Sequence, residues 1–557
     1  MSEDKALTFA PDDFVFIPLG GATGIGMNCF AYGYQGKWLV VDCGIGFPDE
    51  NLPGVEALLP SVDFLEQHQE DIVGLVITHA HEDHIGGVAY LWHKLHCPIY
   101  VTPFANELLR HKLTEMGLLG RVDVIVTPPG HVLRLDPFEV ELIAMAHSVP
   151  EPTALAIRTK AGTVLHSGDW KFENPLLGEP MDRTALKEVA KEGILAFVCD
   201  STNVMGKATD ATEADVRETL KTLIAGYPHQ QVFVTCFASN IVRLESIYLA
   251  AEAANKQVCL LGRSLERMDA AARSTGYFEH IPEFLSEEEA AAMPKGSVIY
   301  ACTGCQGEPR SALTRLLSTR PRADTVALES DDVVIFSSRE IPGNEKPIAY
   351  LQKRLKSHGV KIITTDEALV HVSGHFAGDD LKKMYALLKP KIALPVHGDA
   401  LDLLAHVEQA LEWKVPYAVA LEEGQVFKLS EKDPGVIGTV PTAVLALDGK
   451  QIIPLNARVI KNRRQMLEGR TLVLTVVLHK AQNLLGDPQI SAFGLMEEDG
   501  PEMQEVLDNI RQTLEELPLK EKENDEALKA SLTHAVRQVV QEKYGKKALV
   551  NIHLVRV

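Results

Sequence analysis

Histidines and aspartates with the spacing of metal ligands are concentrated in one segment, His-Ala-His-Glu-Asp-His at residues 79–84. An apolar run at 72–77 precedes this segment, and apolar residues at helical spacing over 88–95 follow it, so we expect a turn between a strand and a helix. Neutral imidazoles and carboxylates are the ligands that zinc and manganese take in proteins. Such a turn can direct two pairs of side chains toward adjacent cations, the first being His79 with His81 and the second Asp83 with His84. The segment predicts a metal site; the alternative is a histidine-rich surface loop.

Five other short apolar runs also lead to a residue that can bind a metal. The runs and the residues they reach are 38–41 with Asp42, 140–145 with His147, 163–165 with Asp169, 194–199 with Asp200, and 392–396 with His397. Runs of this length that are rich in Val, Ile and Leu and bounded by Gly or Pro are typical of buried strands. One histidine after a strand is usually an ordinary polar residue, but six endings of ligand type indicate that several strand ends converge on one site.

Length and composition describe a folded, multidomain chain. A chain of 557 residues is too long for a single core, and we expect two to four domains. The longest apolar runs are far too short to cross a membrane, and the polar N-terminus has no signal-peptide core. Eight scattered cysteines fit a reducing compartment, so we expect a cytoplasmic protein without a membrane partner. The close pair Cys302 and Cys305 could be half of a zinc site or a redox pair, although its glycine-rich surroundings favour a turn.

The segment HAHEDHIGG resembles the signature of the metallo-β-lactamase superfamily. This resemblance implies an αββα sandwich with the metal site at one edge. It also implies two divalent ions per chain, with zinc as the first choice and manganese or magnesium as alternatives. By the same resemblance, the first ion is bound by His79, His81 and His147, the second by Asp83, His84 and His397, and Asp169 bridges the two while Asp42 supports the ligands from behind.

The long interval between Asp200 and His397 resembles the β-CASP insertion of nucleases. Asp200 in CDSTN, His375 in HVSGH and His397 in PVHGD match the three motifs of that group, in which a histidine at the third position accompanies RNA substrates. Four further segments are similar to the ribonuclease J family: TCFASN at 235–240, GRS at 262–264, TGCQGEP at 303–309 and SREIPGNE at 338–345. The loops ATGIGMN after Gly21 and SVPEP after His147 depart from the family pattern, which leaves loop detail open but not the metal ligands.

We expect an α/β protein of three parts. A metallo-β-lactamase sandwich at 1–213 is interrupted by a doubly wound β-CASP domain at 214–362 and completed at 363–435. A linker at 436–460 leads to a small α+β domain at 461–557, with strands near 471–478 and 551–557 and amphipathic helices over 503–517 and 526–544.

The resemblance implies a metal-dependent ribonuclease that acts in RNA maturation and decay. Two cations would activate a hydroxide for attack and neutralise the phosphodiester. Asp83 would orient the hydroxide, and His375 would give a proton to the leaving 3′-oxygen; the alternative for His375 is a purely supporting role. Rival hypotheses are a small-molecule metallo-hydrolase, a β-CASP DNA nuclease and a subunit without activity.

A phosphate site is predicted where FASN begins a helix, because helix N-termini bind anions. Ser239 and Asn240 would face the HVSGH backbone and hold the 5′-monophosphate of single-stranded RNA, which implies 5′-to-3′ exonuclease activity beside endonuclease activity. The alternative is that Ser239 and Asn240 are only helix caps, and His371 either touches a phosphate or closes the loop. The loop residues proposed to bind RNA are His371, Val372, Ser373, Gly374 and His375.

The net charge is 55 − 76 = −21, so an RNA substrate requires a locally basic groove; alternatively the acidic excess serves solubility. Scattered cations that could line the RNA path are Arg263, Arg267, Arg310, Lys382 and Lys383. A denser basic group, Lys461 with Arg463 and Arg464, would touch either RNA or the catalytic domain. By resemblance we expect a homodimer, or a tetramer, assembled through the C-terminal domain, and partners in an RNA-degradation complex.

Overall fold

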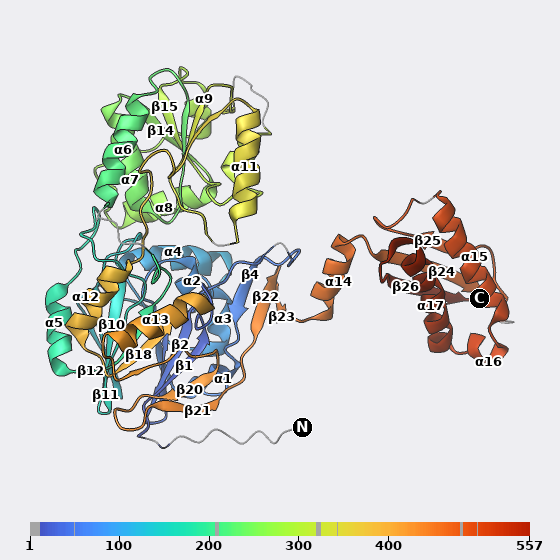
Figure 1. The fold of residues 1–557 in the computed structure, drawn as a ribbon, viewed down its shortest axis with the longest axis horizontal. Coiled ribbons are helices and arrows are strands. Elements are labelled where there is room, and N and C mark those ends of the chain that lie inside the picture. The colour runs from blue at the N-terminus through green and yellow to red at the C-terminus, as the bar shows by residue number, and fades with distance from the viewer. Residues whose placement is uncertain are drawn as a thin grey trace. The chain divides into compact units, whose positions relative to one another are not determined.

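The structure is a computed structural model that describes residue 10 and residues 12–49, 51–206, 211–318, 325–341, 343–479, 483–497 and 499–557. The chain divides into two compact units (Figure 1), one formed by residues 1–47 and 58–444 and the other by 48–57 and 445–557. No helix in the described part of the chain combines the length and the apolar character that a membrane span requires.

Two large β-sheets with facing apolar sides form the base of the first unit. The first sheet has the order β21-β20-β1-β2-β3-β5-β6-β7 and the second the order β19-β18-β12-β11-β10-β9-β8. The strands of the first are β1 (Val15–Gly20), β2 (Cys29–Tyr34), β3 (Lys37–Val41), β5 (Ile72–Val76), β6 (Ile99–Val101), β7 (Val124–Val126), β20 (Gln425–Lys428) and β21 (Gly435–Thr439). The strands of the second are β8 (Val132–Leu135), β9 (Phe138–Ala144), β10 (Thr153–Thr159), β11 (Gly162–His166), β12 (Ile194–Asp200), β18 (Ile392–Val396) and β19 (Tyr417–Ala418).

The two sheets pack through one core because alternate side chains of each strand point toward the other sheet. Phe16, Phe30 and Tyr32 of the first sheet lie in the same buried cluster as Leu155 and Ile157 of the second. A second cluster joins the outer face of the second sheet to α5 (Arg183–Glu192), α12 (Gly378–Leu388) and α13 (Ala400–Glu412). The other helices of this part include α1 (Asp63–Glu66), α2 (Glu82–Ile85), α3 (Val88–Leu95) and α4 (Pro103–Glu115). The predicted sandwich is confirmed.

The inserted domain is a five-stranded, wholly parallel sheet in the order β14-β15-β13-β16-β17. Helices α9, α10 and α11 cover one face through an apolar cluster, and α7 contacts β14 and β15. The strands are β13 (Val232–Thr235), β14 (Gln257–Leu261), β15 (Val298–Cys302), β16 (Val333–Phe336) and β17 (Lys361–Ile363). The helices are α6 (Glu213–Ala225), α7 (Ile241–Ala253), α8 (Arg263–Ser274), α9 (Glu287–Ala291), α10 (Ala312–Leu316) and α11 (Glu345–Ser357). The predicted doubly wound insertion is confirmed.

The cysteine pair that could have been half of a metal site lies in this domain. Cys302 ends β15 and Cys305 lies in the turn that follows, and both thiols are free and buried. Neither belongs to a group of three or more metal-ligand side chains within the described residues. The pair therefore has the structural position in a turn that its glycine-rich surroundings indicate.

After β17 the chain returns to the sandwich and brings distant motifs together. It passes through HVSGH (371–375) and α12 into β18, which pairs in parallel with β12. In this pairing Val396 lies opposite Asp200, so that His397 emerges from the sheet beside the end of β12. Parallel neighbours end at one edge of a sheet, which is how motifs almost two hundred residues apart meet.

The second unit is α+β, as predicted. Its sheet has the order β25-β24-β26, with β24 and β26 parallel, and packs on helices through one apolar cluster. The elements are β24 (Thr471–Leu478), β25 (Gln489–Ser491), β26 (Leu549–Arg556), α15 (Pro501–Glu516), α16 (Leu519–Lys522) and α17 (Asp525–Tyr544). The range expected to be a linker contains β22 (Val444–Asp448) and β23 (Gln451–Pro454), which precede α14 (Arg458–Leu467). The boundaries near 213, 362, 435 and 460 stay predictions.

The basic group on α14 makes contacts inside the second unit. Arg463 donates from both terminal nitrogens to the carboxylate of Asp448, at 3.0 and 2.7 Å. Arg464 donates to the backbone carbonyl of Asn51 at 2.6 Å. Two of the three cations are therefore held by partners within their own unit.

Candidate metal centre

All seven predicted metal ligands meet at the edge of the sandwich where β5, β9, β11 and β18 end. They form two groups that share Asp169, and within each group the ligand atoms lie within 4.8 Å of one another. The first group is His79, His81, His147 and Asp169; the second is Asp83, His84, Asp169 and His397. The two groups of candidate ligands therefore share one carboxylate, that of Asp169.

The first group has the geometry of a tetrahedral site. Nδ1 of His81 lies 3.1 Å from Nε2 of His79 and 3.0 Å from Nε2 of His147, and these two Nε2 atoms each lie 3.7 Å from Oδ2 of Asp169. A tetrahedron with metal–nitrogen bonds of about 2.0–2.1 Å has edges of about 3.3 Å. The three imidazole nitrogens and the carboxylate oxygen therefore fit one divalent ion.

The second group is richer in carboxylate. Nε2 of His397 lies 3.5 Å from Oδ2 of Asp83 and 3.7 Å from Oδ2 of Asp169, and Nε2 of His84 lies 3.4 Å from Oδ1 of Asp169. Two carboxylates and two imidazoles suit zinc or manganese. Asp169 thus offers oxygen atoms to both groups.

Burial keeps the histidines of the first group neutral. It lowers the pKa of His79 and of His147 well below the usual value and that of His81 to about 4, and the nearby carboxylates do not reverse this. A metal binds only the neutral imidazole, whose ring nitrogen has a free lone pair. The site is therefore ready to bind a cation without first releasing protons from these rings.

The second group carries a strong negative potential. Burial opposes a charge on His84, but Asp169, Asp83 and Asp42 outweigh it and raise the pKa of His84 well above its usual value. Likewise, burial works against ionisation of Asp169, yet the surrounding histidines, led by His397 and His84, hold the pKa of Asp169 well below its usual value. A region that stabilises a protonated imidazole also attracts a divalent cation.

Asp42 is hydrogen-bonded to a predicted ligand, His84, in the supporting position that the resemblance implied. Its carboxylate accepts from Nδ1 of His84 at 2.7 Å, and from the backbone N–H and the hydroxyl of Thr78 at 2.7 and 2.8 Å. The bond to Nδ1 directs Nε2 of His84 toward the site, where it lies 3.1 Å from Nδ2 of Asn28. Asp42 and His397 both have positive φ values, of 59° and 55°, in the left-handed region where such backbone strain accompanies function.

Asn28 is a supporting residue that the sequence did not reveal. Its Oδ1 accepts from Nδ1 of His397 at 2.9 Å, and its Nδ2 donates to the backbone carbonyl of Asp83 at 3.1 Å. It lies in the loop that departs from the family pattern. An asparagine is not a usual zinc ligand, so neither its type nor its spacing marked it.

Gly44 allows the loop after β3 to press against the ligand turn. A Cβ at this position would lie 1.7 Å from the carbonyl oxygen of Asp83 and 2.7 Å from the backbone nitrogen of His84. The backbones are therefore in direct contact, and any side chain at residue 44 would displace both ligands.

His375 lies beside Asp169, the carboxylate that the two ligand groups share. Its Nδ1 donates to Oδ2 of Asp200 at 2.8 Å, and the same atom is 4.0 Å from Oδ2 of Asp169. Burial lowers the pKa of His375, but Asp200 and Asp169 outweigh it and raise the pKa to about 9. A protonated imidazole in this place can donate a proton to a leaving oxygen. The other oxygen of Asp200 accepts from Thr202, so Asp200 orients His375.

The HVSGH segment is bonded directly to a predicted ligand. Nδ1 of His147 donates to the carbonyl of Gly374 at 2.7 Å, and the hydroxyl of Ser373 accepts from the N–H of His375 at 3.1 Å. Val372 is buried. Neither ring nitrogen of His371 has a hydrogen-bond partner among the described residues, and burial, together with Arg243, Arg339 and Lys171, keeps its pKa well below the usual value.

Ser239 and Asn240 open α7 next to this segment, and the ring of Phe237 lies 6.2 Å from that of His371. Oδ1 of Asn240 accepts from the backbone N–H of Arg243 at 2.9 Å, so Asn240 does cap the helix. The cap uses only the oxygen, which leaves the amide nitrogen of Asn240 and the hydroxyl of Ser239 as candidate phosphate donors.

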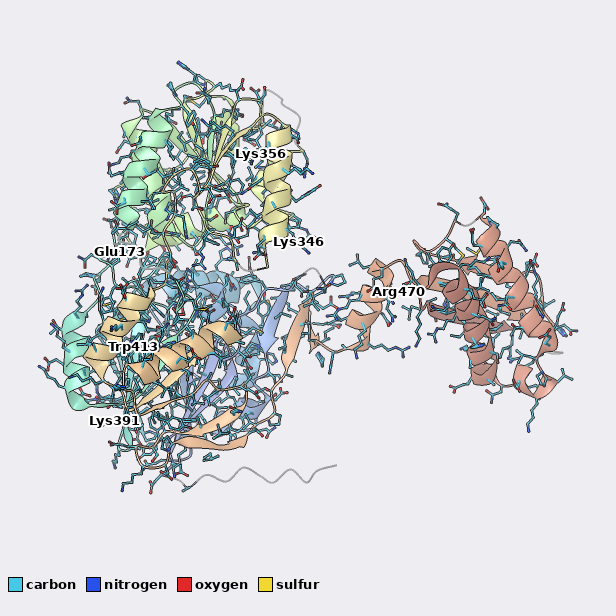
Figure 2. The ribbon with its side chains drawn as sticks, viewed as in Figure 1. Glu173, Lys346, Lys356, Lys391, Trp413 and Arg470 are labelled. Atoms are coloured by element: carbon cyan, nitrogen blue, oxygen red, sulfur yellow. The ribbon has the colours of Figure 1, made fainter. Side chains whose placement is uncertain are left out.

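Arg243, fully buried, ties the inserted domain to both chain segments that join it to the sandwich. Nη2 donates to the two carboxylate oxygens of Glu213 at 2.9 Å, and Nη1 donates to the carbonyls of Ser337 and Val370 at 2.9 Å. Glu213 begins α6 on the outgoing segment, where its N–H donates to Glu173, labelled in Figure 2. Val370 precedes His371 on the returning segment. Arg243 therefore fixes the chain just before the HVSGH segment against α7, the helix that Asn240 caps.

Four family models match the chain. They are the metallo-beta-lactamase superfamily at residues 22–223, the ribonuclease J beta-CASP domain at 229–355, the Zn-dependent metallo-hydrolase RNA specificity domain at 359–417 and the ribonuclease J C-terminal domain at 458–557. A ribonuclease J of Sinorhizobium meliloti is 38% identical over 98% of both chains, and a ribonuclease J 1 of Streptococcus pyogenes is 31% identical over 98% of both. A crystal structure of a protein of unknown function from Enterococcus faecalis has a TM-score of 0.51 at 15% identity, covers 74% of this chain and 99% of its own, and supports the fold alone.

The sandwich, the inserted domain and the histidine–aspartate centre define a β-CASP metallo-hydrolase that binds divalent metal. The models and relatives together span nearly the whole chain. The chain belongs to the ribonuclease J family and is a metal-dependent ribonuclease.

Asn28→Ala should lower metal affinity by about 10- to 100-fold, the usual effect of losing a hydrogen bond that orients a ligand. Without Asn28, Nδ1 of His397 loses its acceptor and the ring its orientation. Competition with a chromophoric chelator measures the change. Asn106→Ala, on α4, is the matched control and should bind metal as the unmodified chain does. Equal metal affinity in all three proteins would show that Asn28 does not position His397.

Proposed function

We propose that the centre holds two divalent ions, preferably zinc, and that the enzyme degrades single-stranded RNA from a 5′-monophosphate in the 5′-to-3′ direction as well as cutting internally. The sharing of Asp169 by two groups of ligands carries the first part of the proposal. Zinc is preferred because three imidazoles and one carboxylate are a usual zinc set. The proposed ligands are the seven side chains already described.

When bound, two divalent ions supply Lewis acidity that lowers the pKa of a water and neutralises charge on the phosphodiester. The side chains of Asp83 and His375 are each 20% exposed, whereas those of His84, Asp169 and His397 are at most 4% exposed. Asp83 and His375 therefore border the accessible side of the centre. Asp83 accepts a proton from the attacking water and holds it in line, and His375, oriented by Asp200, donates a proton to the leaving 3′-oxygen.

His375→Gln should lower kcat by about 10²- to 10⁴-fold, as expected for a lost proton donor, while the metal content is unchanged. His397→Ala should instead lose metal. Single-turnover cleavage and metal analysis of each purified variant separate the two effects, with His131→Gln, an exposed position, as control. Metal lost from the His375 variant but retained in the His397 variant would mean that the two roles are reversed.

The 5′-end preference is supported by a group of donors beside the centre, which would form the 5′-phosphate pocket. The Ser239 hydroxyl and the Asn240 amide lie at the start of a thirteen-residue helix, and the positive end of the helix dipole there favours an anion. The unpartnered ring nitrogens of His371 and the nearby Arg339 and Lys171 add to a site that accepts negative charge. A terminal monophosphate satisfies these donors, whereas a 5′-hydroxyl leaves them unpaired.

Ser239→Ala combined with Asn240→Asp should remove the 5′-end preference. The aspartate keeps the oxygen that caps α7 but replaces the amide donor with a charge that repels phosphate. Unpaired donors cost about 1–3 kcal/mol, so the unmodified enzyme should favour monophosphorylated over hydroxyl RNA by about 5- to 150-fold. Product lengths from RNAs with monophosphate, triphosphate and hydroxyl ends measure this. Internal cleavage should persist in the variant, and equal degradation of all three ends by the unmodified enzyme would refute the pocket.

We also propose that the second unit mediates homodimerisation. Its strand β26 is an edge strand, and Leu485, Phe493 and Val555 are exposed apolar residues of the same unit. Sedimentation should show dimers for the whole chain and monomers for the chain truncated after residue 450. A truncated chain that remains dimeric places the contact in the first unit instead.

A further inference from the structure

A segment of the inserted domain has the opposite charge to the chain as a whole. Residues 345–361 contain Lys346, Lys353, Arg354, Lys356 and Lys361 but a single acid, Glu345, whereas the chain has a net charge of −21. These residues form α11 and the start of β17. The segment contributes a local excess of four positive charges, which is the kind of basic surface that an acidic protein needs to bind a polyanion.

The cations of this segment form no ion pair within the described structure, although Lys356 lies close enough to Glu367 to help lower the pKa of that carboxyl. Lys346, Lys353, Lys356 and Lys361 are exposed, and none of the five takes part in an ion pair there. Elsewhere many exposed lysines are paired, for example Lys191 with Glu188 and Lys221 with Glu218. The charges of α11 are therefore available to a ligand.

An aromatic ring lies among these charges. Lys346, Tyr350 and Lys353 are spaced four and three residues apart, so they occupy one face of α11. Tyr350 is 65% exposed, and the guanidinium of Arg354 lies 5.9 Å from the centre of its ring. Figure 2 shows Lys346 and Lys356 at opposite ends of the helix. Cations interleaved with an exposed aromatic ring are typical of surfaces that bind single-stranded nucleic acid.

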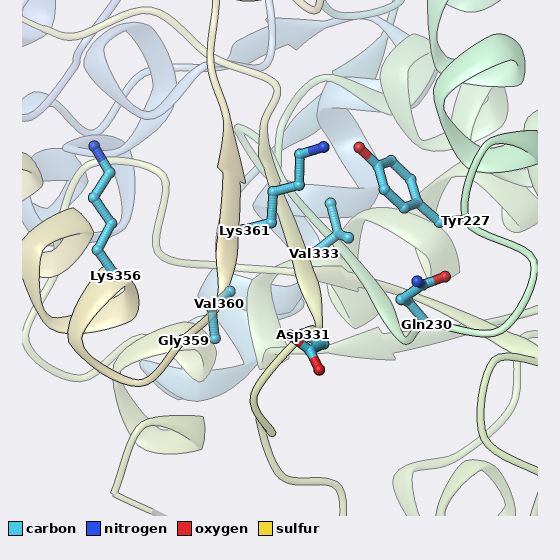
Figure 3. Close-up of a pocket in the computed structure, with 8 residues that line it drawn as sticks. All are labelled: Tyr227, Gln230, Asp331, Val333, Lys356, Gly359, Val360 and Lys361. Atoms are coloured by element: carbon cyan, nitrogen blue, oxygen red, sulfur yellow. The ribbon is translucent and has the colours of Figure 1, made fainter.

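This stripe of exposed side chains on α11 ends at a cavity that Lys356, in the last turn of the helix, helps to line. This cavity, of about 530 Å³, is lined by Tyr227, Gln230, Asp331, Val333, Lys356, Gly359, Val360 and Lys361. Figure 3 shows the Lys361 side chain extending toward the ring of Tyr227, and its ammonium lies 5.1 Å from the ring centre. The lining offers two ammonium groups, one aromatic ring, an amide and a carboxylate, which together can pair with a phosphate, a base and a sugar hydroxyl.

The topology links this stripe to the catalytic side of the domain. β16 ends at Phe336 on the carboxyl edge of the sheet, and α11 then runs back toward the edge where β17 begins. The start of α11 is held on the carboxyl edge because Gln306 bonds to Arg339 and Ile341 in the preceding loop. Thirteen residues of helix span about 20 Å, so the stripe extends from the edge that carries Asn240 to the opposite edge.

We infer that the α11 surface, with the cavity at its end, binds the sugar-phosphate backbone of the RNA substrate outside the catalytic cleft. This inference rests on the proposed function. The part of the substrate that remains outside is the 3′ body, since the 5′ end occupies the centre. The lysines pair with phosphates, Tyr350 stacks on a base, and Asp331 accepts from a sugar hydroxyl or a base amino group. An acidic protein could pair with the lysines through its carboxylates, but unlike RNA it has no nucleobases to stack on the ring of Tyr350.

The test combines Lys346→Ala, Lys353→Ala and Lys356→Ala in the whole chain. Each lost contact with single-stranded RNA lowers the slope of log affinity against log salt by about 0.7, so the slope should fall by about 2. For a 5′-monophosphorylated RNA of about 30 nucleotides, KM should rise at least tenfold with kcat unchanged. For one of about 5 nucleotides, which occupies only the cleft, both constants should stay the same.

The matched control is Lys37→Ala with Lys191→Ala and Lys221→Ala, which removes three lysines that are each ion-paired with an acid. Binding is measured by anisotropy of a 5′-hydroxyl RNA with chelator present, so it depends neither on cleavage nor on the 5′ pocket. Loss of affinity in the α11 variant but not in the control supports the inference. If the unmodified chain binds and cleaves RNA and the α11 variant matches it in affinity and salt slope, the inference is overturned and the surface suits an acidic protein instead. If the unmodified chain neither binds nor cleaves RNA, the proposed function itself fails.

Discussion

The structure depends on the burial of many charged and polar groups in one small volume. Asp169 belongs to both ligand groups and to a third group that it forms with Asp200 and His375. Its carboxylate faces four histidines, His79, His84, His147 and His397. Uncompensated buried charge is costly, so each of these groups must be hydrogen-bonded or bound to a cation. The supporting bonds from Asp42, Asn28 and Gly374 occupy the rear nitrogens of the rings and leave their front nitrogens facing one another. Divalent cations satisfy what the protein does not.

Hydrogen bonds also connect the metal centre to the HVSGH segment and to the inserted domain. The carbonyl of Gly374 holds His147, and the neighbouring Ser373 and His375 belong to the segment proposed to contact the substrate. Arg243 then connects this segment, through Val370, to the helix that begins after Asn240 and to Glu213. A shift of the inserted domain would therefore move the HVSGH segment and change the orientation of His147 at the same time. These hydrogen bonds connect the inserted domain to His147.

The two basic groups of this acidic chain differ in whether their charges are paired. The basic group of α14 is held by Asp448 and the backbone of Asn51, so its density in sequence does not translate into free charge. Among the described residues, the basic residues of α11 form no ion pair, although in sequence they are no more conspicuous. Whether a cation is available to RNA is decided by its neighbours in space.

The sequence by itself determined the elements and the ligand types. An apolar run predicted β18 at its observed bounds, because buried strands in parallel sheets are almost continuously apolar and need no tertiary information to be recognised. The segment at 79–84 and the strand endings contain every member of the two ligand groups, since His and Asp at such positions are informative by type. Tertiary structure decided what spacing cannot encode. Asn28 meets His397 across 369 residues, Gly44 touches Asp83 backbone to backbone, and the partners of Arg243 come from three separate segments. These contacts join groups of ordinary residue type, and only the folded backbone brings them within hydrogen-bonding distance.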